Sequence, residues 1–389
     1  MLRVPMAKIH PVRALRYTES AGPIAALATL PYDVIPAALE TEYKGRSVHN
    51  FAHLILPQGD YAGARRRLDE WTSAGVLAVD DAAAIFVYEQ TFPAPYTGEV
   101  LVRRGFIALG ETEDYGRTIY RHERTMSGPK EDRFRLLDAT RVQFDSVFML
   151  FPDTQGTVES RMTQVTSGEP DLEYTDHEKT LHRLWRISDE SWIAALQSEM
   201  ADAKLLIADG HHRYETALRM GQPKTLMTFV SLQSPGLRSF ATHRLVHGIE
   251  GFDAESFLSK LPNVGPGLEL KSPEGHVRIG VAVEDGEYHA DIAAGPDELN
   301  VSVLQDRVLT PLLGLTPEKV AAGGHLTYVK QLPAALEEVG AGREQIAFLL
   351  EDLPVEGVAR VSFAGQVLPQ KSTFFYPKLG SGLVMYPLD

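Results

Sequence analysis

Hydrophobic residues recur at every second position in some stretches of the chain and at every third or fourth position in others. These two patterns predict strands and helices respectively. A short apolar run, LLIA at 205–208, is followed by Asp209 and Gly210 and then by the helix-forming stretch HHRYETALRM. The run has the length of a buried strand, and Asp-Gly is typical of a break between elements. We therefore predict a strand, a tight turn in which Asp209 caps the helix, and a helix that begins near His211.

The same reasoning predicts elements along the rest of the chain. Strands are expected at 84–92, 100–111, 181–189 and 224–234, a hairpin with an Asp-Gly turn at 277–293, and helices at 60–75, 191–203 and 303–314. Gly314 is expected to end the last of these helices. Residues 151–180 are polar and rich in turn formers, and they predict a hairpin or an exposed excursion rather than part of the core.

Composition narrows the class of protein. The 389 residues are 44% hydrophobic and 23% charged, which is typical of a globular protein of two or three domains. A formal charge of −14 argues against a nucleic-acid binder. The chain has no cysteine, which excludes thiol nucleophiles, disulfides and cysteine-ligated zinc. No apolar run approaches the roughly 18 residues of a membrane span, so we expect a cytoplasmic protein, with Met6 as an alternative start.

The turn after the 205–208 strand carries candidate chemistry. The first turn of a helix offers free backbone N–H groups and the positive end of its dipole, which suit a phosphate. Arg213 adds a planar fork of donors, and Gly210, His211, His212 and Thr216 complete the candidate phosphate-binding set. In the alternative interpretation, Asp209 only caps the helix and the histidines are solvated.

The stretch ADGHHRYETAL resembles the phosphate-binding box of the ParB/sulfiredoxin superfamily, whose free-serine kinases carry a very similar Asp-Gly-His-His-Arg. The whole chain is similar to a widespread prokaryotic family labelled as a domain of unknown function. The matching stretches are HPVRALR, PYDVI, RHERT, KEDR, LHRLWRI, THRLVH and QKSTFFYPKLGSGL. The resemblance implies an α/β (α+β) fold, with a ParB/sulfiredoxin-like nucleotide-binding core and additional mixed α/β lobes.

The domain organisation expected from this resemblance has three parts. Residues 1–110 form an N-terminal mixed α/β lobe, 111–249 the core, and 250–389 a C-terminal α/β lobe whose tail returns to the site. Glu123 and Asp209 are 86 residues apart, much farther than in the small kinases. We expect an insertion at about 150–195 to account for the difference.

The resemblance also suggests a catalytic base. In the serine kinases a glutamate that precedes an arginine-bearing helix acts as the base, and Glu123 has the corresponding place here. The alternative is that Glu123 forms a salt bridge with a neighbouring arginine. Candidate substrate-binding residues lie around it, at His122, Thr125, Lys130 and Arg133.

Two further groups of basic and hydroxyl residues are candidates for substrate binding. His243 and Arg244 form a basic pair at a predicted strand end. The tail segment provides Lys371, Ser372, Thr373 and Lys378, which could clamp a phosphate or carboxylate or could equally be solvated.

Together these features predict a phosphotransferase that moves a phosphate from ATP or ADP to the hydroxyl of a small amino acid, most simply free L-serine. Glu123, Asp209 and His211 are the candidate catalytic residues, and Asp209 with Asp132 would hold Mg²⁺. No Walker-type loop is present. The alternatives are a metal-dependent hydrolase, with His122, His182 and His243 as further ligands, and a non-catalytic nucleotide- or metabolite-binding regulator. The expected partners are the nucleotide and a small-molecule substrate, with no nucleic acid and no membrane, and a homodimer is left open.

Overall fold

The chain folds into two compact units, which are described separately here. The structure, a computed structural model, describes residues 7–95, 97–123 and 127–388, with 127–130 described by their backbone alone. The first unit comprises Met1–Arg121, Met126–Leu237 and Pro377–Asp389, and the second comprises His122–Thr125 and Arg238–Tyr376. The predicted lobe at 1–110 and most of the predicted core at 111–249 thus fall in the same compact unit. The division into three parts stays a prediction.

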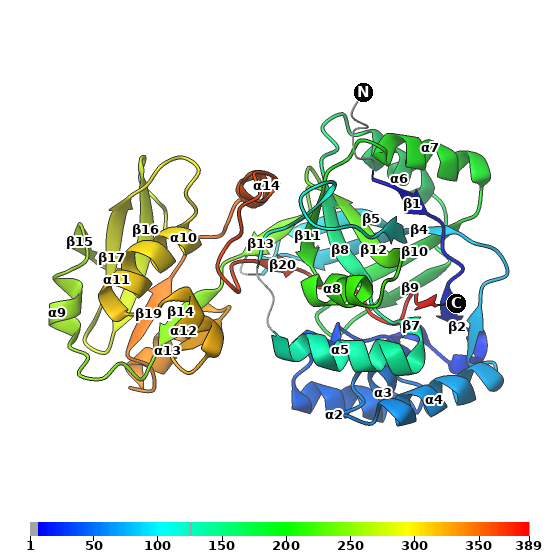
Figure 1. Ribbon diagram of the computed structural model, residues 1–389, viewed down its shortest axis with the longest axis horizontal. Helices are drawn as coiled ribbons and strands as arrows, with labels where there is room; N and C mark the ends of the chain where they lie inside the picture. The colour runs from blue at the N-terminus through cyan, green and yellow to red at the C-terminus, as the bar shows by residue number, and fades with distance from the viewer. Residues whose placement is uncertain (1–6, 96, 124–126, 389) are drawn as a thin grey trace. The chain divides into compact units, whose positions relative to one another are not determined.

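The first unit is built on a mixed sheet, shown in Figure 1. Within the described residues its path is β6-β11-β8-β12-β5-β4-β10-β9, with β1 beside β5. The strands are β1 Ile9–His10, β4 Ile85–Pro93, β5 Val100–Glu111, β6 Ile119–Arg121, β8 Val147–Phe151, β9 Leu172–Thr175, β10 Leu181–Ile187, β11 Leu205–Asp209 and β12 Lys224–Ser231. Strand β11 runs parallel to β6 and antiparallel to β8. The first unit also has two separate two-stranded sheets, one of β2 Leu15–Tyr17 with β3 Leu77–Val79 and one of β7 Val142–Gln143 with β21 Tyr386–Pro387.

Helices accompany this sheet, and α5 packs against both α4 and α8 (Figure 1). Their bounds are α1 Ile24–Leu27, α2 Ala37–Arg46, α3 Ala52–Ile55, α4 Tyr61–Ser73, α5 Ser127–Thr140, α6 Thr157–Thr166, α7 Glu190–Met200 and α8 His211–Arg219, with 3₁₀ turns at Glu19–Ala21 and Tyr32–Val34. The strands and helices predicted at 84–92, 100–111, 181–189, 224–234, 60–75 and 191–203 are confirmed within a few residues at their ends. The mixed α/β class is confirmed with them.

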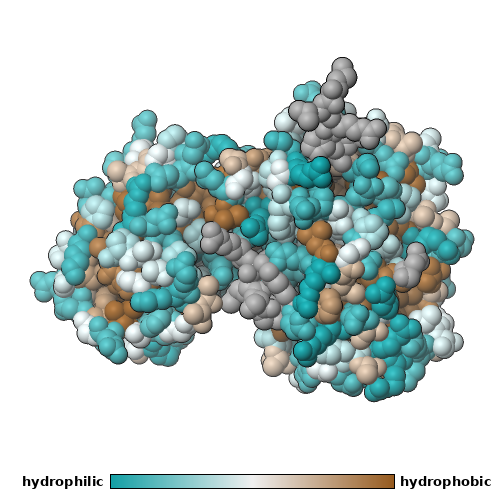
Figure 2. Space-filling view, in the orientation of Figure 1, coloured by the Kyte–Doolittle hydropathy of each residue, from teal (hydrophilic) through white to brown (hydrophobic). Residues whose placement is uncertain are grey.

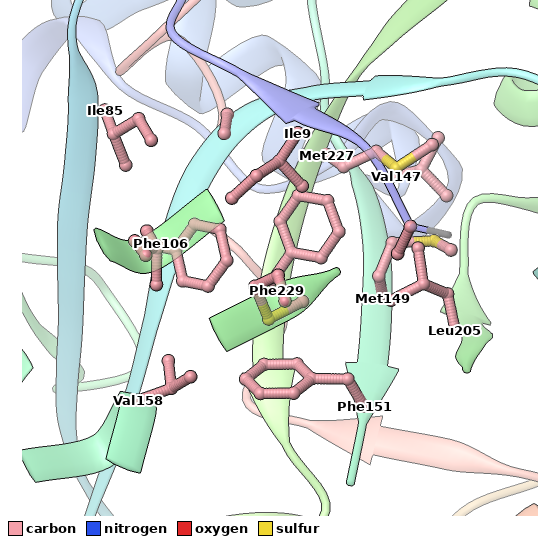
Figure 3. Close-up of a cluster of buried hydrophobic side chains, with 14 of the residues drawn as sticks. Ile9, Ile85, Phe106, Val147, Met149, Phe151, Val158, Leu205, Met227 and Phe229 are labelled. Carbon is pink, nitrogen blue, oxygen red and sulfur yellow. The ribbon is translucent and has the colours of Figure 1, made fainter. Parts of the chain in front are cut away.

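The main core of the first unit lies against this sheet. The Phe106 and Phe229 rings stack with centroids 4.8 Å apart, and Phe151 lies 6.2 Å from Phe106 (Figure 3). Val158 and Met162, four residues apart on α6, are buried in the same cluster. The prediction that 151–180 lies outside the core is therefore wrong for α6, whereas a hairpin is present where β9 pairs with β10. The few apolar residues of α6 fall on one face of the helix, and the polar majority that dominated the pattern faces away from the core.

The predicted strand, turn and helix around 205–218 are confirmed, but the cap is not Asp209. Strand β11 includes Asp209, and Gly210 is the residue before the helix, with a left-handed φ of 90°. A glycine takes this conformation without steric penalty. The carboxylate of Asp209 bonds to side chains instead of to the helix N–H groups, so the N-cap prediction is wrong.

The second unit contains an antiparallel sheet whose described strands follow the order β15-β17-β16-β19-β14-β18. The strands are β14 His243–Val246, β15 Val264–Pro266, β16 His276–Val283, β17 Gly286–Ala293, β18 Leu326–Val329 and β19 Ile346–Leu349, with β13 Arg238–Phe240 paired to β20 Phe374–Tyr376. The helices are α9 Ala254–Leu258, α10 Asn300–Leu304, α11 Thr310–Leu313, α12 Pro317–Ala322, α13 Leu332–Gly340 and α14 Val355–Phe363. The hairpin at 277–293 is confirmed, and so is the helix end at Gly314, which is left-handed.

A π-helical turn, Gln305–Leu309, lies between α10 and α11. The segment from Asn300 to Leu313 is therefore helical throughout but changes its hydrogen-bond spacing in the middle. Such turns rotate the side chains that follow them, and they often occur at functional sites.

The surface of the chain is mixed in polarity. Figure 2 shows hydrophilic residues spread over the viewed face, with hydrophobic residues in small groups between them. None of the helices in the described part of the chain is long and apolar enough to cross a bilayer. The cytoplasmic location, the absence of nucleic-acid binding and the oligomeric state stay predictions.

Candidate functional site

Asp209 lies at the end of β11 between two cations of the first unit. Its Oδ2 accepts from Lys378 Nζ at 2.6 Å, and its Oδ1 lies 3.5 Å from Arg213 NH2. Burial would raise the pKa of this carboxyl, but Lys378 and then Arg213 outweigh burial and hold the pKa well below its usual range. Asp209 is therefore a permanent anion held between two cations at the entrance to helix α8.

Arg213 is fixed by the backbone around it. Its NH1 donates to the carbonyl of Ser146, and its guanidinium packs on Gly210. A Cβ at Gly210 would lie only 2.9 Å from Arg213 Nε, so both the left-handed backbone and this close approach require glycine there. Burial lowers the pKa of Arg213, but Asp209, Asp145 and Asp33 raise it above its usual value.

A small cavity of about 50 Å³ lies beside Arg213 and is also lined by Arg133, Asp145, Thr216 and Thr225. Asp145 Oδ1 is buried and has no hydrogen-bond partner among the described residues. Burial raises the pKa of Asp145, while Arg213 and a hydrogen bond with Ser381 oppose that shift. A buried acceptor beside two guanidinium groups makes this cavity polar enough for water or a small polar group.

The tail that carries Lys378 is held by buried groups of the sheet. Arg103, which is 1% exposed, donates to the carbonyl of Pro377 at 2.6 Å, and Gln90 donates to that of Lys378 at 2.8 Å. Burial lowers the pKa of Arg103 to about 10, so it is still a cation at neutral pH. These contacts fix the backbone from which Lys378 reaches Asp209.

A chain of buried hydrogen bonds holds the next residues of the tail. Gly380 N donates to Tyr88 Oη at 3.0 Å, the Tyr88 hydroxyl lies 2.6 Å from His182 Nδ1, and His182 Nε2 lies 3.1 Å from Asp176 Oδ2. The Tyr174 ring stacks on His182 with centroids 4.5 Å apart. Since Nε2 faces a carboxylate, we assign the proton to Nε2 and the acceptor role to Nδ1. Burial lowers the pKa of His182, although Asp176 opposes the shift.

The other predicted residues of the α8 box lie close to this centre. His211 is buried and contributes to lowering the pKa of Asp209, whereas His212 is half-buried. Thr216 is buried, and its hydroxyl donates to the carbonyl of His212 at 2.7 Å. The phosphate-binding role of these residues stays a prediction.

Asp132 and Arg133, also in the first unit, are bonded to each other. Asp132 accepts from Tyr61 Oη at 2.8 Å and from Arg133 Nε at 2.8 Å. Arg133 also donates to the carbonyl of Ile55 at 3.0 Å. The carboxylate of Asp132 is thus shared by two donors, and its assignment to Mg²⁺ stays a prediction. Thr125 lies outside the described residues, as does the side chain of Lys130.

The remaining predicted residues belong to the second unit, whereas the α8 box belongs to the first. His122 is buried, with Nε2 2.8 Å from Thr373 Oγ1 and 4.0 Å from a Glu123 carboxylate oxygen. The charge of Glu123 also acts on Arg244. A salt bridge between Glu123 and a neighbouring arginine stays a prediction, since Arg124 lies outside the described residues. The role of Glu123 as the base stays a prediction.

The basic pair and the start of the tail are also placed in the second unit. Leu350 N donates to His243 Nδ1 at 3.2 Å, and Arg244 NH2 lies 3.4 Å from the carbonyl of Lys371. Ser372 is buried, and its hydroxyl donates to the carbonyl of Pro369. Their substrate-binding role is untested.

The histidines proposed for a metal-dependent hydrolase have separate local partners. His182 bonds to Tyr88 and Asp176, His243 to Leu350, and His122 to Thr373. Among the described residues, no group of three or more His, Asp or Glu side chains could hold a metal ion. The structure therefore gives the hydrolase alternative no added support.

Sequence reasoning missed several groups of this site. Asp145, Arg103 and Tyr88 lie on or beside apolar strands, where they look like ordinary polar interruptions. A charged residue within a buried strand needs a partner. Arg103 lies in the apolar run VLVRRGFIAL, so the sequence could have indicated that this arginine has a buried partner.

Three solved structures illustrate what the chain is similar to. A free serine kinase in complex with AMP aligns with a TM-score of 0.40 and 14% identity, over 68% of this chain and 89% of that one. A conserved hypothetical protein from Pyrococcus furiosus gives 0.38 and 14%, over 66% and 87%. SbnI from Staphylococcus aureus, truncated at its C-terminus, gives 0.39 and 12%, over 72% and 86%. These scores are too low to carry an argument about activity.

No curated protein matches the sequence. One protein family does, over residues 9–310, and it is described as a protein of unknown function, DUF1015. This match confirms the family membership that the motifs indicated. Since the match covers most of its length, the chain belongs to the DUF1015 family.

Proposed function

We propose that this protein is a phosphotransferase that moves a phosphoryl group from ATP or ADP to the hydroxyl of a small amino acid, with free L-serine as the first candidate. The observation that carries the proposal is the position of Lys378 and Arg213, which flank Asp209 at the start of α8. Phosphoryl transfer needs little covalent chemistry from the protein, but it needs cations and N–H donors around the phosphates.

The proposed phosphate site uses the first turn of α8. The N–H groups of Gly210 and the residues after it, together with the positive end of the helix dipole, would hold one phosphate. Lys378 and Arg213 would exchange part of their contact with Asp209 for contact with the phosphate oxygens. Arg213 keeps its orientation during this exchange because NH1 is bonded to the Ser146 carbonyl. His211 and His212 would add donors on the same turn.

Asp209 is the residue that fits the Mg²⁺ that accompanies a nucleotide. Mg²⁺ binds through one or two carboxylates together with substrate phosphates and water, so a full protein cage is not required. Asp209 is ionised and close to the proposed phosphates, whereas Asp132 is bonded to Tyr61 and Arg133. When bound, the ion would neutralise charge that develops on the transferred group.

The acceptor hydroxyl needs a base, and Glu123 is proposed for that role from the resemblance alone. The balanced step moves the terminal phosphoryl group from a nucleotide oxygen to the acceptor oxygen, and the hydroxyl proton goes to the base. The products are a phosphorylated amino acid and a nucleotide with one phosphate fewer.

Nucleotide binding tests the phosphate site directly. Titration calorimetry of the full chain with ADP and Mg²⁺ should give one site, and Arg213→Gln should weaken binding by roughly tenfold or more, since it removes a charge-assisted contact. Arg219→Gln is the matched control, because Arg219 lies at the other end of the same helix and is 54% exposed. Equal affinity in both variants would remove the phosphate role.

Turnover separates the alternatives. Incubation with ATP or ADP, Mg²⁺ and each free amino acid should yield a phosphorylated amino acid, and Glu123→Gln should keep nucleotide binding and lose the product. Nucleotide binding without transfer to any amino acid would favour the regulator. Hydrolysis that depends on a tightly bound transition metal would favour the hydrolase.

A further inference from the structure

A second cavity lies entirely within the second unit and is larger than the one beside Arg213. It has a volume of about 330 Å³. Its walls come from the end of α10 and the π-helical turn, from α12 and β18, and from the chain at 367–370. A volume in this range is typical of small-molecule pockets.

One wall of this cavity is Arg244, a buried cation. The side chain is 3% exposed and donates to the carbonyls of Thr242, at 2.5 Å, and Lys371, at 3.4 Å. A guanidinium has five N–H donors. Two are used in these bonds, which leaves three without a protein acceptor among the described residues.

Arg244 is in direct contact with no carboxylate within the described part of the chain, although Glu123 is near enough to oppose the effect of burial on its pKa. Its guanidinium lies 5.8 Å from the centre of the Tyr328 ring, which lines the same cavity. Burial lowers the pKa of Arg244 to about 10, so the group is charged at neutral pH. A buried cation that has no carboxylate in direct contact is unfavourable, and an anion bound in the cavity would supply that contact.

The π-helical turn supplies an oriented acceptor on another wall. Gln305 is buried, and its Nε2 donates to the Leu315 carbonyl at 2.8 Å and to Thr310 Oγ1 at 3.0 Å. Since a carbonyl accepts one of these bonds, the donor atom must be the amide nitrogen. The Gln305 carbonyl oxygen has no bond of its own within the described residues, and it can accept from a ligand hydroxyl.

We propose that this cavity binds a small hydroxylated monocarboxylate, with Arg244 holding the carboxylate and Gln305 and Tyr328 contacting hydroxyl groups. About 330 Å³ corresponds to roughly eleven water volumes at about 30 Å³ each, which suits a sugar-acid-sized molecule. Asp306 and Glu318 also line the cavity, and their negative charge disfavours a dianion such as a phosphate monoester. None of the residues that line this cavity is proposed to hold the nucleotide phosphates, although Arg244 is also a candidate substrate-binding residue.

Calorimetry on the full chain tests the proposal with three probes: D-gluconate, its uncharged analogue D-glucitol, and glucose 6-phosphate. D-gluconate should bind at one site and raise Tm, D-glucitol should not bind, and glucose 6-phosphate should bind more weakly than gluconate. Arg244→Gln should weaken gluconate binding by roughly tenfold or more. Arg343→Gln, an exposed arginine of the same unit that pairs with Glu338, should leave it unchanged.

A second variant keeps the test independent of the stability of Arg244→Gln. Ala321 is exposed and lines the cavity, so Ala321→Trp should block the cavity with little change in Tm and should abolish gluconate binding. The proposal is overturned if gluconate does not bind, if D-glucitol binds equally well, or if neither variant weakens binding. Tighter binding of glucose 6-phosphate would overturn the choice of a monocarboxylate. ADP binding should be unchanged in both variants, which keeps this outcome distinct from failure of the phosphotransferase proposal.

Discussion

Lys378 Nζ lies 2.6 Å from Asp209 Oδ2, although the two residues are 169 positions apart in the sequence. The contact joins the segment around Lys378 to the end of strand β11 of the first unit. Both side chains are largely buried, with exposures of 15% and 18%. The ion pair therefore holds the tail next to the carboxylate of Asp209, at the start of α8.

A double-mutant cycle should detect this pair. We expect Lys378→Met and Asp209→Asn each to destabilise the protein, since each leaves a largely buried charge with fewer partners. The double variant should be less destabilised than the sum, with a coupling free energy of about 1–2 kcal/mol. Urea unfolding of the four proteins measures it. Additive effects would mean that the ion pair contributes no net stability.

Gly210→Ala should be more damaging than an ordinary substitution of a left-handed glycine. The variant has to accept a φ of 90° and must also displace the Arg213 guanidinium. Gly156→Ala is the matched control, because Gly156 also precedes a helix, with φ 66°, and has open space around its Cβ position. We expect the control to lose about 1 kcal/mol and Gly210→Ala to lose at least about 1 kcal/mol more. Equal losses would show that Arg213 adjusts without penalty.

Tyr88→Phe should loosen the tail that carries Lys378. The variant removes the acceptor of Gly380 N and the hydroxyl that bonds to His182, and it leaves both partners buried. We expect a loss of about 1–3 kcal/mol in the free energy of unfolding, together with weaker ADP binding. Tyr120→Phe, whose hydroxyl donates to the Arg117 carbonyl at the surface, should change neither. If Tyr88→Phe is destabilised but binds ADP as the native chain does, this hydrogen-bond network contributes to stability and not to nucleotide binding.

Acidification should destabilise the second unit through His243. Burial, with Arg244 adding to it, lowers the pKa of His243 to about 4, and the neutral ring accepts a bond from Leu350 N. The unfolded chain takes up this proton near pH 6.5, so the contribution of His243 is complete above that pH and is lost as pH falls toward 4. We expect a loss of about 2 kcal/mol between pH 7 and 5.

Substitution of two histidines, one at a time, tests whether His243 causes this loss of stability. His243→Gln keeps an acceptor for Leu350 N and should lose less stability on acidification than the native chain, as measured by urea midpoints at pH 7 and 5. His276→Gln, in the same unit with its Nδ1 3.0 Å from the Glu274 carbonyl, should behave like the native chain. The same loss in all three proteins would assign the effect to other groups.

The strand, turn and helix at 205–218 could be predicted because they depend on residues that are neighbours in the sequence. An apolar run, a glycine that accepts positive φ and a stretch of helix formers are sufficient to define the three elements. The cap could not be predicted in the same way. Asp209 is a good N-cap in isolation, but Lys378 from the tail and Arg213 from the first turn of α8 bind its carboxylate more strongly than the helix N–H groups do.

The error at 151–180 has a related cause. Average polarity along this segment predicted exposure, whereas burial depends on which face the few apolar residues share, and α6 places Val158 and Met162 on one face. Asp145 and Tyr88 were missed because a polar residue within an apolar run carries no sign of its partner until the fold brings that partner near.

Element types, family membership and the candidate phosphate box thus follow from the order of residues, since helix and strand formation and motif spacing depend on neighbours along the chain. Only the fold decided that Lys378 contacts Asp209, that Arg103 holds the tail, and that Arg244 lines a cavity. These contacts join residues far apart in sequence, and their energies depend on burial and on long-range pairing that no local pattern encodes.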